Sequence, residues 1–208
     1  MIQNRTDDDP SLAAVGELFA SATHDASAAM CRWTNGAVAV TLNEVRRIAL
    51  DEAAAALRVG DEPLTMVVLS LEGELGGHLV LIFDECGGRQ LAAALLGREA
   101  GTAPQWSELE KSALTETGNI LGCAYVNALT RLIGADLVPS PPCFIQDFGA
   151  SVLQQAFMVQ AATSDSLMLC EIGFQRQDEE LDWRVVFVPA RALEEALERS
   201  LQAAVPGD

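Results

Sequence analysis

Apolar residues recur at helical spacing in the segment that follows Pro10. Asp9 and Pro10 are typical of an N-cap and the first helical residue after it. The apolar positions then continue at steps of three and four residues: Leu12, Val15, Phe19, Ala22, Ala26 and Met30. We therefore expect an α-helix from about residue 10 to Arg32.

The next part of the chain carries shorter patterns. An Asn-Gly dipeptide at 35–36 favours a turn, and apolar residues at 38, 40 and 42 alternate as in a half-buried strand. Further on, the pattern predicts a short alanine-rich helix at 51–57, a hairpin of strands at 64–71 and 77–83, and a helix at about 88–96.

The second half of the sequence repeats this order of elements. A long helix is expected from Trp106 to about Ile133, a strand after Pro142, a short helix around 151–160, a hairpin at 167–174 and 183–188, and a helix at 190–201. A shift of 99 residues places Glu17 on Glu116 and aligns the two long helices. This correspondence suggests an internal duplication.

The fold class predicted from this pattern is α+β. Each hairpin is too small to be stable alone, so the two halves should share one antiparallel sheet with helices packed on it. We expect one domain over residues 1–208, with pseudo-repeats at about 10–97 and 106–203 related by a pseudo-twofold axis. Each repeat would contain a helix, a strand, a short helix, a β-hairpin and a helix.

Composition narrows the classes of partner. The 208 residues include 13 basic and 30 acidic side chains, a formal charge of −17 that would repel nucleic acid and anionic membranes. The five cysteines form no CxxC pair, and the apolar runs are far shorter than the ~20 residues of a membrane span. We expect a cytoplasmic protein without nucleic-acid or membrane partners, and neither histidine has zinc-ligand spacing.

The helix expected after Trp106 carries a polar strip. Ser107 and Glu110 have the spacing of a capping box at its start. A buried stripe is predicted at Leu109, Ala113, Thr117, Ile120, Ala124, Ala128 and Leu132. Ser112, Glu116 and Asn119 fall within an arc of roughly 60° at 100° per residue, with Cys123 next along it.

Spacing alone gives this strip two interpretations. It could be the ordinary outer face of an amphipathic helix, or a carboxylate and a carboxamide placed to grip a cation and orient a water. Gly118 and Gly122 lie beside the strip, although glycine costs ~1 kcal/mol relative to alanine inside a helix. They could permit the approach of another chain or close packing of the helix on its other side.

The strip also extends into a longer motif. Ser112, Glu116, Asn119 and Pro142 are separated by three, two and twenty-two residues. The spacing and the surrounding residues resemble the CheC, CheX and FliY phosphatases of bacterial chemotaxis, whose motif has Asp or Ser at the first position, followed by Glu, Asn and Pro. The tight resemblance covers about 40 residues, and the order of elements extends it loosely over nearly the whole chain.

The resemblance implies a fold with internal pseudo-twofold symmetry and a substrate, the aspartyl phosphate of a CheY-like receiver domain. By that analogy Glu116 and Asn119 are catalytic: Asn119 would position the attacking water and Glu116 would pair with a lysine of the receiver. Ser112 and Pro142 would support the motif, Pro142 by shaping the entry to a strand. No cofactor is expected on this chain, because the magnesium would belong to the receiver.

The first half departs from the motif. Glu17 is present, but Ala13, Ala20 and Asn43 stand where the serine, asparagine and proline would be. Without an amide at position 20 this half cannot orient a water, so we expect one active site.

Two other functions are compatible with the sequence. One is a non-catalytic module that binds a receiver, a CheD-like deamidase or a flagellar switch, and the other is a general adaptor that has kept the fold. A CheD-like deamidase and a second copy of the chain, as a homodimer, are therefore further candidate partners.

Overall fold

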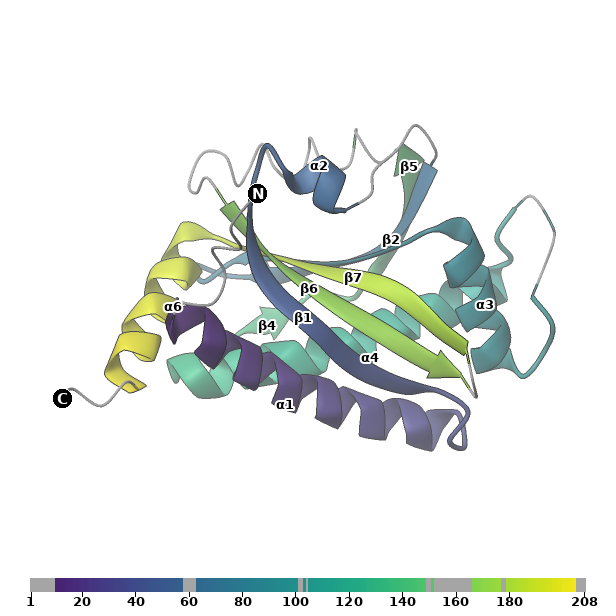
Figure 1. Ribbon diagram of the computed structural model, residues 1–208, viewed down its shortest axis with the longest axis horizontal. Coiled ribbons are helices and arrows are strands. Elements are labelled where there is room, and N and C mark those ends of the chain that lie inside the picture. The colour runs from purple at the N-terminus through teal and green to yellow at the C-terminus, as the bar shows by residue number, and fades with distance from the viewer. Residues whose placement is uncertain are drawn as a thin grey trace, which may run out of the picture.

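A single antiparallel sheet forms the centre of the protein in a computed structural model that describes residues 10–57, 63–100, 103, 105–148, 151, 166–176 and 179–204 (Figure 1). The strands lie in the order β1, β6, β7, β3, β2, and both β4 and β5 pair with the outer edge of β2. Their bounds are β1 Ala39–Ala49, β2 Pro63–Glu72, β3 Gly77–Phe83, β4 Val138–Pro139, β5 Cys143–Phe148, β6 Ser166–Arg176 and β7 Glu179–Pro189.

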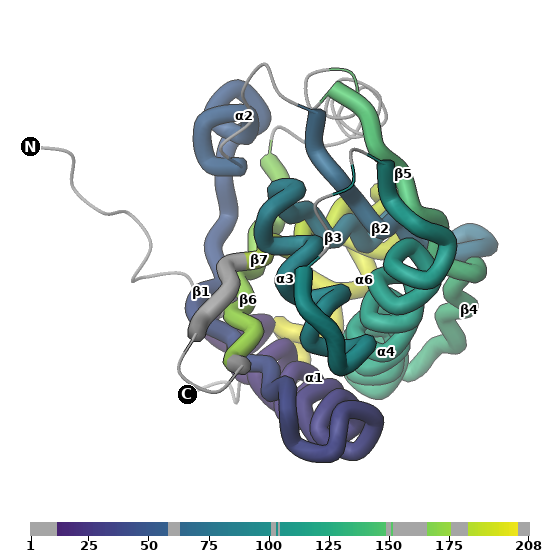
Figure 2. Tube along the Cα trace, turned by 90° about the vertical axis from the view of Figure 1, so that its right-hand side faces the viewer, coloured from purple at the N-terminus to yellow at the C-terminus, as the bar shows by residue number. Residues whose placement is uncertain are grey.

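Helices cover the sheet unequally. One face is packed by α1 (Pro10–Trp33), α3 (Glu85–Leu96), α4 (Glu108–Ile133) and α6 (Arg191–Ala204), which share a core cluster with the strands. The two long helices α1 and α4 run side by side across this face (Figure 1, Figure 2). The short helix α2 (Ala53–Ala56) packs on a second cluster at the opposite face.

The interface between α1 and α4 is closely packed. Phe19 of α1 lies 5.0 Å from Tyr125 of α4 between ring centroids, and both side chains are fully buried. The hydroxyl groups of Tyr125 and Thr23 are hydrogen-bonded at 2.8 Å. An aromatic contact and a buried hydrogen bond therefore join the two helices.

The predicted fold class is confirmed, because the chain is a mixed α and β structure around one antiparallel sheet. The apolar positions expected in the first helix are all buried there. The short helix expected around 151–160 falls, apart from Ser151, outside the described residues. The duplication and the bounds of the two pseudo-repeats stay predictions.

The strand pairing is nevertheless symmetric about the β3–β7 pair. The first strand of each half pairs with the hairpin of the other half: β1 with β6, and β5 with β2. In β1 the register shifts between Leu42 and Glu44, which leaves Asn43 as one extra residue. Pro142 lies 99 residues later, in the break between β4 and β5, where three residues again face two of β2. Both halves therefore bulge at the same position.

The predicted buried stripe of α4 was partly wrong. Leu109 is 56% exposed, and Ile120, Ala124 and Leu132 are only half-buried. The buried side of the helix is instead made by these residues: Glu110, Ala113, Leu114, Thr117, Gly118, Leu121, Gly122, Tyr125, Val126, Ala128 and Leu129. The helix is turned relative to the expectation because its two glycines face the sheet.

Candidate functional site

Two glycines bring α4 close to the sheet. A Cβ atom added to Gly118 would overlap Val67 Cγ1 of β2, and one added to Gly122 would overlap Leu69 Cδ2. The missing side chains therefore allow the helix to pack directly on β2. Of the two interpretations of these glycines, close packing on the other side of the helix is the one that the structure supports.

The start of α4 is anchored by buried charge. Ser107 is the N-cap: its backbone N–H and hydroxyl group donate to Glu110 Oε2 at 2.8 and 2.7 Å, and its hydroxyl accepts from the Glu110 N–H at 3.3 Å. The expected capping box is present. Glu110 Oε1 also lies 3.2 Å from Arg98 Nη2 and 3.7 Å from Arg89 Nη1. The guanidinium of Arg89 stacks 4.4 Å from the Trp106 ring, which closes this end of the helix.

These contacts determine the ionisation of Glu110. Burial by itself would raise the pKa of the carboxyl group, but two hydrogen bonds from Ser107 and the charges of Arg89 and Arg98 outweigh it. The pKa of Glu110 is therefore lowered from its ordinary value. An ionised, fully paired carboxylate holds the first turn of α4 in place directly before Ser112.

The three predicted polar residues lie together on the outward side of α4. Ser112 and Glu116 are exposed and Asn119 is half-buried. Among the residues that the structure describes, Glu116 has no ion-pair partner. The structure thus presents a free carboxylate and a carboxamide less than one helical turn apart on a helix whose other side is fixed to the sheet.

The Asn119 side chain has a defined neighbour. Cys123 Sγ donates to Asn119 Oδ1 at 3.6 Å, from one turn further along the helix. Burial, followed by the negative charge of Glu116, raises the pKa of the Cys123 thiol. The thiol therefore stays protonated and able to donate at neutral pH. The sequence placed Cys123 next to the strip but gave no indication of this bond.

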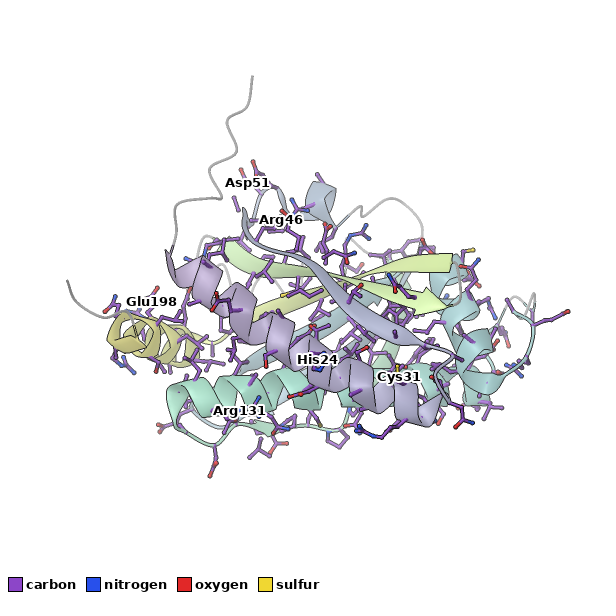
Figure 3. The ribbon with its side chains drawn as sticks, turned by 60° about the horizontal axis from the view of Figure 1, so that its bottom comes forward. His24, Cys31, Arg46, Asp51, Arg131 and Glu198 are labelled. Atoms are coloured by element: carbon purple, nitrogen blue, oxygen red, sulfur yellow. The ribbon has the colours of Figure 1, made fainter. Side chains whose placement is uncertain are left out.

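Asn119 also borders an open groove between α1 and α4. The groove has a volume of about 330 Å³ and is lined by Asp25, Ala26, Ala29, Asn119, Ile120, Cys123, Ala124, Asn127 and Arg131. Arg131 Nη2 and Asp25 Oδ2 are 4.0 Å apart across it. Figure 3 looks onto this face of the two helices, with His24 on α1 and Arg131 on α4. Hydrophobic periodicity could not reveal the groove, because it depends on how the helices pack.

Pro142 lies at the edge of the sheet rather than on α4. The segment before it is held by two bonds to β2, Ser140 N–H to Ser70 O at 2.7 Å and Ser70 N–H to Ser140 Oγ at 3.0 Å. Proline is tolerated in a bulge because a residue there need not donate a ladder hydrogen bond. The position is consistent with the expected structural role, in which Pro142 shapes the entry to β5.

In the first half the matching residues also point outward. Ala13, Glu17 and Ala20 are exposed on α1, and Asn43 is exposed in the bulge of β1. The backbone of α1 thus presents the corresponding positions, but no carboxamide stands on the helix among them. The first half therefore lacks the carboxamide that α4 presents at Asn119.

No helix among the described residues is long and apolar enough to cross a membrane. Within the same residues, no group of three or more histidine, cysteine, aspartate or glutamate side chains is arranged to hold a metal ion.

The fold is shared with several solved structures. The structure superposes on FliY of Thermotoga maritima with a TM-score of 0.74 and 15% sequence identity, covering 99% of this chain and 100% of that one. It matches the FliM middle domain of H. pylori with a TM-score of 0.67 and 15% identity, over 92% of this chain and 99% of that one. A chain in the CheX–CheY–BeF3–Mg2+ complex of Borrelia burgdorferi matches with a TM-score of 0.53 and 17% identity. The match covers 81% of this chain and 96% of that one.

Comparison of the amino-acid sequence with those of known proteins gives a related protein with a named activity. No protein-family model matches the chain. The chain is 26% identical to the CheY-P phosphatase CheC of Bacillus subtilis (strain 168) over 172 residues, which cover 81% of this chain and 82% of CheC. The resemblance inferred from the motif is therefore confirmed, and the chain is related to the CheC/CheX/FliY family.

Proposed function

We propose that the chain is a phosphatase that hydrolyses the aspartyl phosphate of a CheY-like receiver domain at a single site centred on Asn119. The observation that carries the proposal is the Asn119 carboxamide, held on the outward face of α4 beside the free carboxylate of Glu116. The similarity to CheC supports the substrate class. A protein partner fits this geometry, because the residues lie on an open helical face.

The proposed chemistry needs no nucleophile on this chain. The oxygen of a water attacks phosphorus, the bond between phosphorus and the aspartate oxygen breaks, and the aspartate leaves as a carboxylate. The water oxygen and both of its protons pass to inorganic phosphate, which releases a proton to solvent according to the pH. Phosphoryl transfer is catalysed largely by positioning and charge stabilisation. Asn119 would orient the water, and the magnesium ion would be supplied by the receiver.

Glu116 has a separate proposed role. A carboxylate brought next to a phosphoryl group is repelled by it unless a cation lies between or beside them. The exposed Glu116 has no cationic partner in the described part of the chain, so its carboxylate is available to a lysine of the receiver. This pairing would align the two proteins and leave Asn119 over the phosphoryl group.

Release of inorganic phosphate from a phosphorylated receiver tests this proposal. The native chain should accelerate dephosphorylation above the receiver's own decay, whereas Asn119→Ala and Glu116→Ala should reduce the acceleration by about 100-fold, as misplacement of the reacting groups does. Glu17→Ala is the matched control, since Glu17 occupies the corresponding position on α1, where no carboxamide follows. Equal rates for Asn119→Ala and the native chain would overturn the proposal.

A second function is favoured by the similarity to the FliM middle domain, which has the same fold. The chain would then bind a receiver or a flagellar-switch component without hydrolysis. Binding of the beryllofluoride form of a receiver without any acceleration of phosphate release would support this function. A CheD-like deamidase and a homodimer stay predictions, for which binding to CheD and the molar mass in solution are the measurements.

A further inference from the structure

The neighbour of Asn119 suggests a role for a residue outside the motif. Cys123 lies one turn after Asn119 on the same side of α4, and its Sγ is 3.6 Å from Asn119 Oδ1. Both side chains are half-buried at the margin of the groove between α1 and α4. We propose that Cys123 is a positioning residue, whose thiol fixes the rotation of the Asn119 carboxamide and thereby determines which of its ends meets the attacking water. This inference rests on the proposed phosphatase function.

The hydrogen-bonding groups of the two side chains determine which end of the Asn119 carboxamide faces Cys123. A carboxamide presents an acceptor at one end and two donors at the other, and rotation by 180° about its last bond exchanges them. A protonated thiol donates to the oxygen, whereas after rotation the amide nitrogen would face sulfur, which is only a weak acceptor. The thiol therefore favours the rotamer in which Oδ1 points toward Cys123.

The environment keeps the thiol in its donating form. Burial and the charge of Glu116 both raise the pKa of Cys123. The same carboxylate that is proposed to pair with the receiver thus also disfavours the thiolate, which could accept from the amide and reverse its orientation. One lone pair of Oδ1 is occupied by the thiol, and the second is left for a hydrogen of the water.

The backbone around Asn119 is held rigidly, so a single hydrogen bond to the side chain can determine its orientation. Gly118 and Gly122 flank Asn119 and pack against Val67 and Leu69, so the backbone between positions 118 and 122 is fixed to β2. Asn119 can then change its conformation only by rotation about the bonds of its side chain. Because catalysis requires the group that orients the water to be held closely in its productive geometry, restricting this freedom should act on kcat.

A structural role for Cys123 predicts different behaviour. If the thiol only fills space in the groove, then Cys123→Ala should change stability or receiver affinity and leave the chemical step unchanged. Cys123→Ser shortens the side chain slightly and replaces the thiol donor with a hydroxyl donor at the same position. The pair of variants therefore separates the loss of a donor from the loss of volume.

The test compares the native chain, Cys123→Ala and Cys123→Ser. For each protein, kcat and KM are measured for phosphate release from a phosphorylated CheY-like receiver. The affinity of each protein for the beryllofluoride form of that receiver is measured as well. Cys123→Ala should lower kcat about fivefold, the equivalent of the ~1 kcal/mol that a neutral hydrogen bond contributes, with KM and affinity unchanged. Cys123→Ser should restore kcat to within about twofold of native.

The outcomes separate this inference from the proposed function. A native chain that binds the receiver but does not accelerate phosphate release overturns the phosphatase function itself. An active native chain with the same kcat in Cys123→Ala overturns the positioning role alone. Equal losses in the alanine and serine variants overturn it as well, because the serine retains the donor.

Discussion

Gly118 of α4 lies directly against Val67 of β2, and the contact leaves no room for a Cβ atom. The two residues fix both the height of α4 above the sheet and its rotation about its own axis. With this side turned inward, Ser112, Glu116 and Asn119 necessarily face outward. The position of the candidate site therefore depends on a residue that has no side chain.

Gly118→Ala should destabilise the protein by up to about 2 kcal/mol, because overpacking against Val67 costs about 1–3 kcal/mol and the gain in helix propensity returns ~1 kcal/mol. Gly16→Ala in α1 is the matched control, since nothing lies within 4 Å of its added Cβ, and it should stabilise by up to ~1 kcal/mol. Urea denaturation gives both values. A Gly118→Ala variant as stable as Gly16→Ala would contradict the close packing.

The buried carboxylate of Glu110 should make stability depend on pH. Its pKa is lower in the folded chain than its ordinary value of 4.5, so the ionised form stabilises the fold above that pH, and the contribution is lost as the pH falls through the folded pKa. At pH 7, Glu110→Gln should cost about 1 kcal/mol, because the charge-assisted bonds to Ser107 and the pairing with Arg98 and Arg89 are weakened while Arg89 keeps Glu85.

The measurement is the free energy of unfolding of the native chain and Glu110→Gln between pH 7 and pH 3. The difference between the two proteins should narrow as the pH falls below 4.5, where the native carboxyl group also becomes neutral. A difference that stays constant over this range would show that the Glu110 charge does not contribute.

Pro142 should act on the strand entry and not on the chemistry. Pro142→Ala removes a restriction on the unfolded chain and should lower the free energy of unfolding by about 0.4–1 kcal/mol, provided that the bulge keeps its shape. Thermal unfolding of the variant and the native chain measures this change. A loss of several kcal/mol would mean that the proline determines the pairing of β4 and β5 with β2.

The first half offers a test of why it should be inactive. Ala20 is exposed on α1 where a carboxamide would stand, and Glu17 precedes it at the correct spacing. In an Asn119→Ala background, adding Ala20→Asn should restore some acceleration of phosphate release, because an amide then follows a carboxylate on an outward helical face. No gain at all would show that α1 lacks more than the amide.

Much of this architecture could be predicted from apolar periodicity. The buried positions of α1 follow its 3.6-residue repeat, and the hairpins follow short apolar runs bounded by turns. The far end of β1 could not be predicted in this way, since its residues 43–47 are mostly polar. There the strand is stabilised across the sheet edge, where Arg46 Nη2 bonds Glu171 Oε1 at 2.9 Å.

The candidate site was predictable in part. Residue spacing placed Glu116 and Asn119 on one face of a helix, but the buried side of α4 was misplaced because Gly118 and Gly122 carry no hydrophobic signal. The groove beside Asn119 depends on the packing of α1 against α4, which no local pattern encodes. The bond from Cys123 matches an i, i+4 spacing, yet only the rotamers reveal it.

The most direct measurement of the central claim is the decay of a phosphorylated CheY-like receiver in the presence of the native chain or of Asn119→Ala, with binding of each to the beryllofluoride receiver measured in parallel. We predict that the native chain shortens the lifetime of the aspartyl phosphate, and that Asn119→Ala binds equally well but is about 100-fold less effective. Equal acceleration by the two proteins, or none by the native chain despite binding, would contradict the role of Asn119.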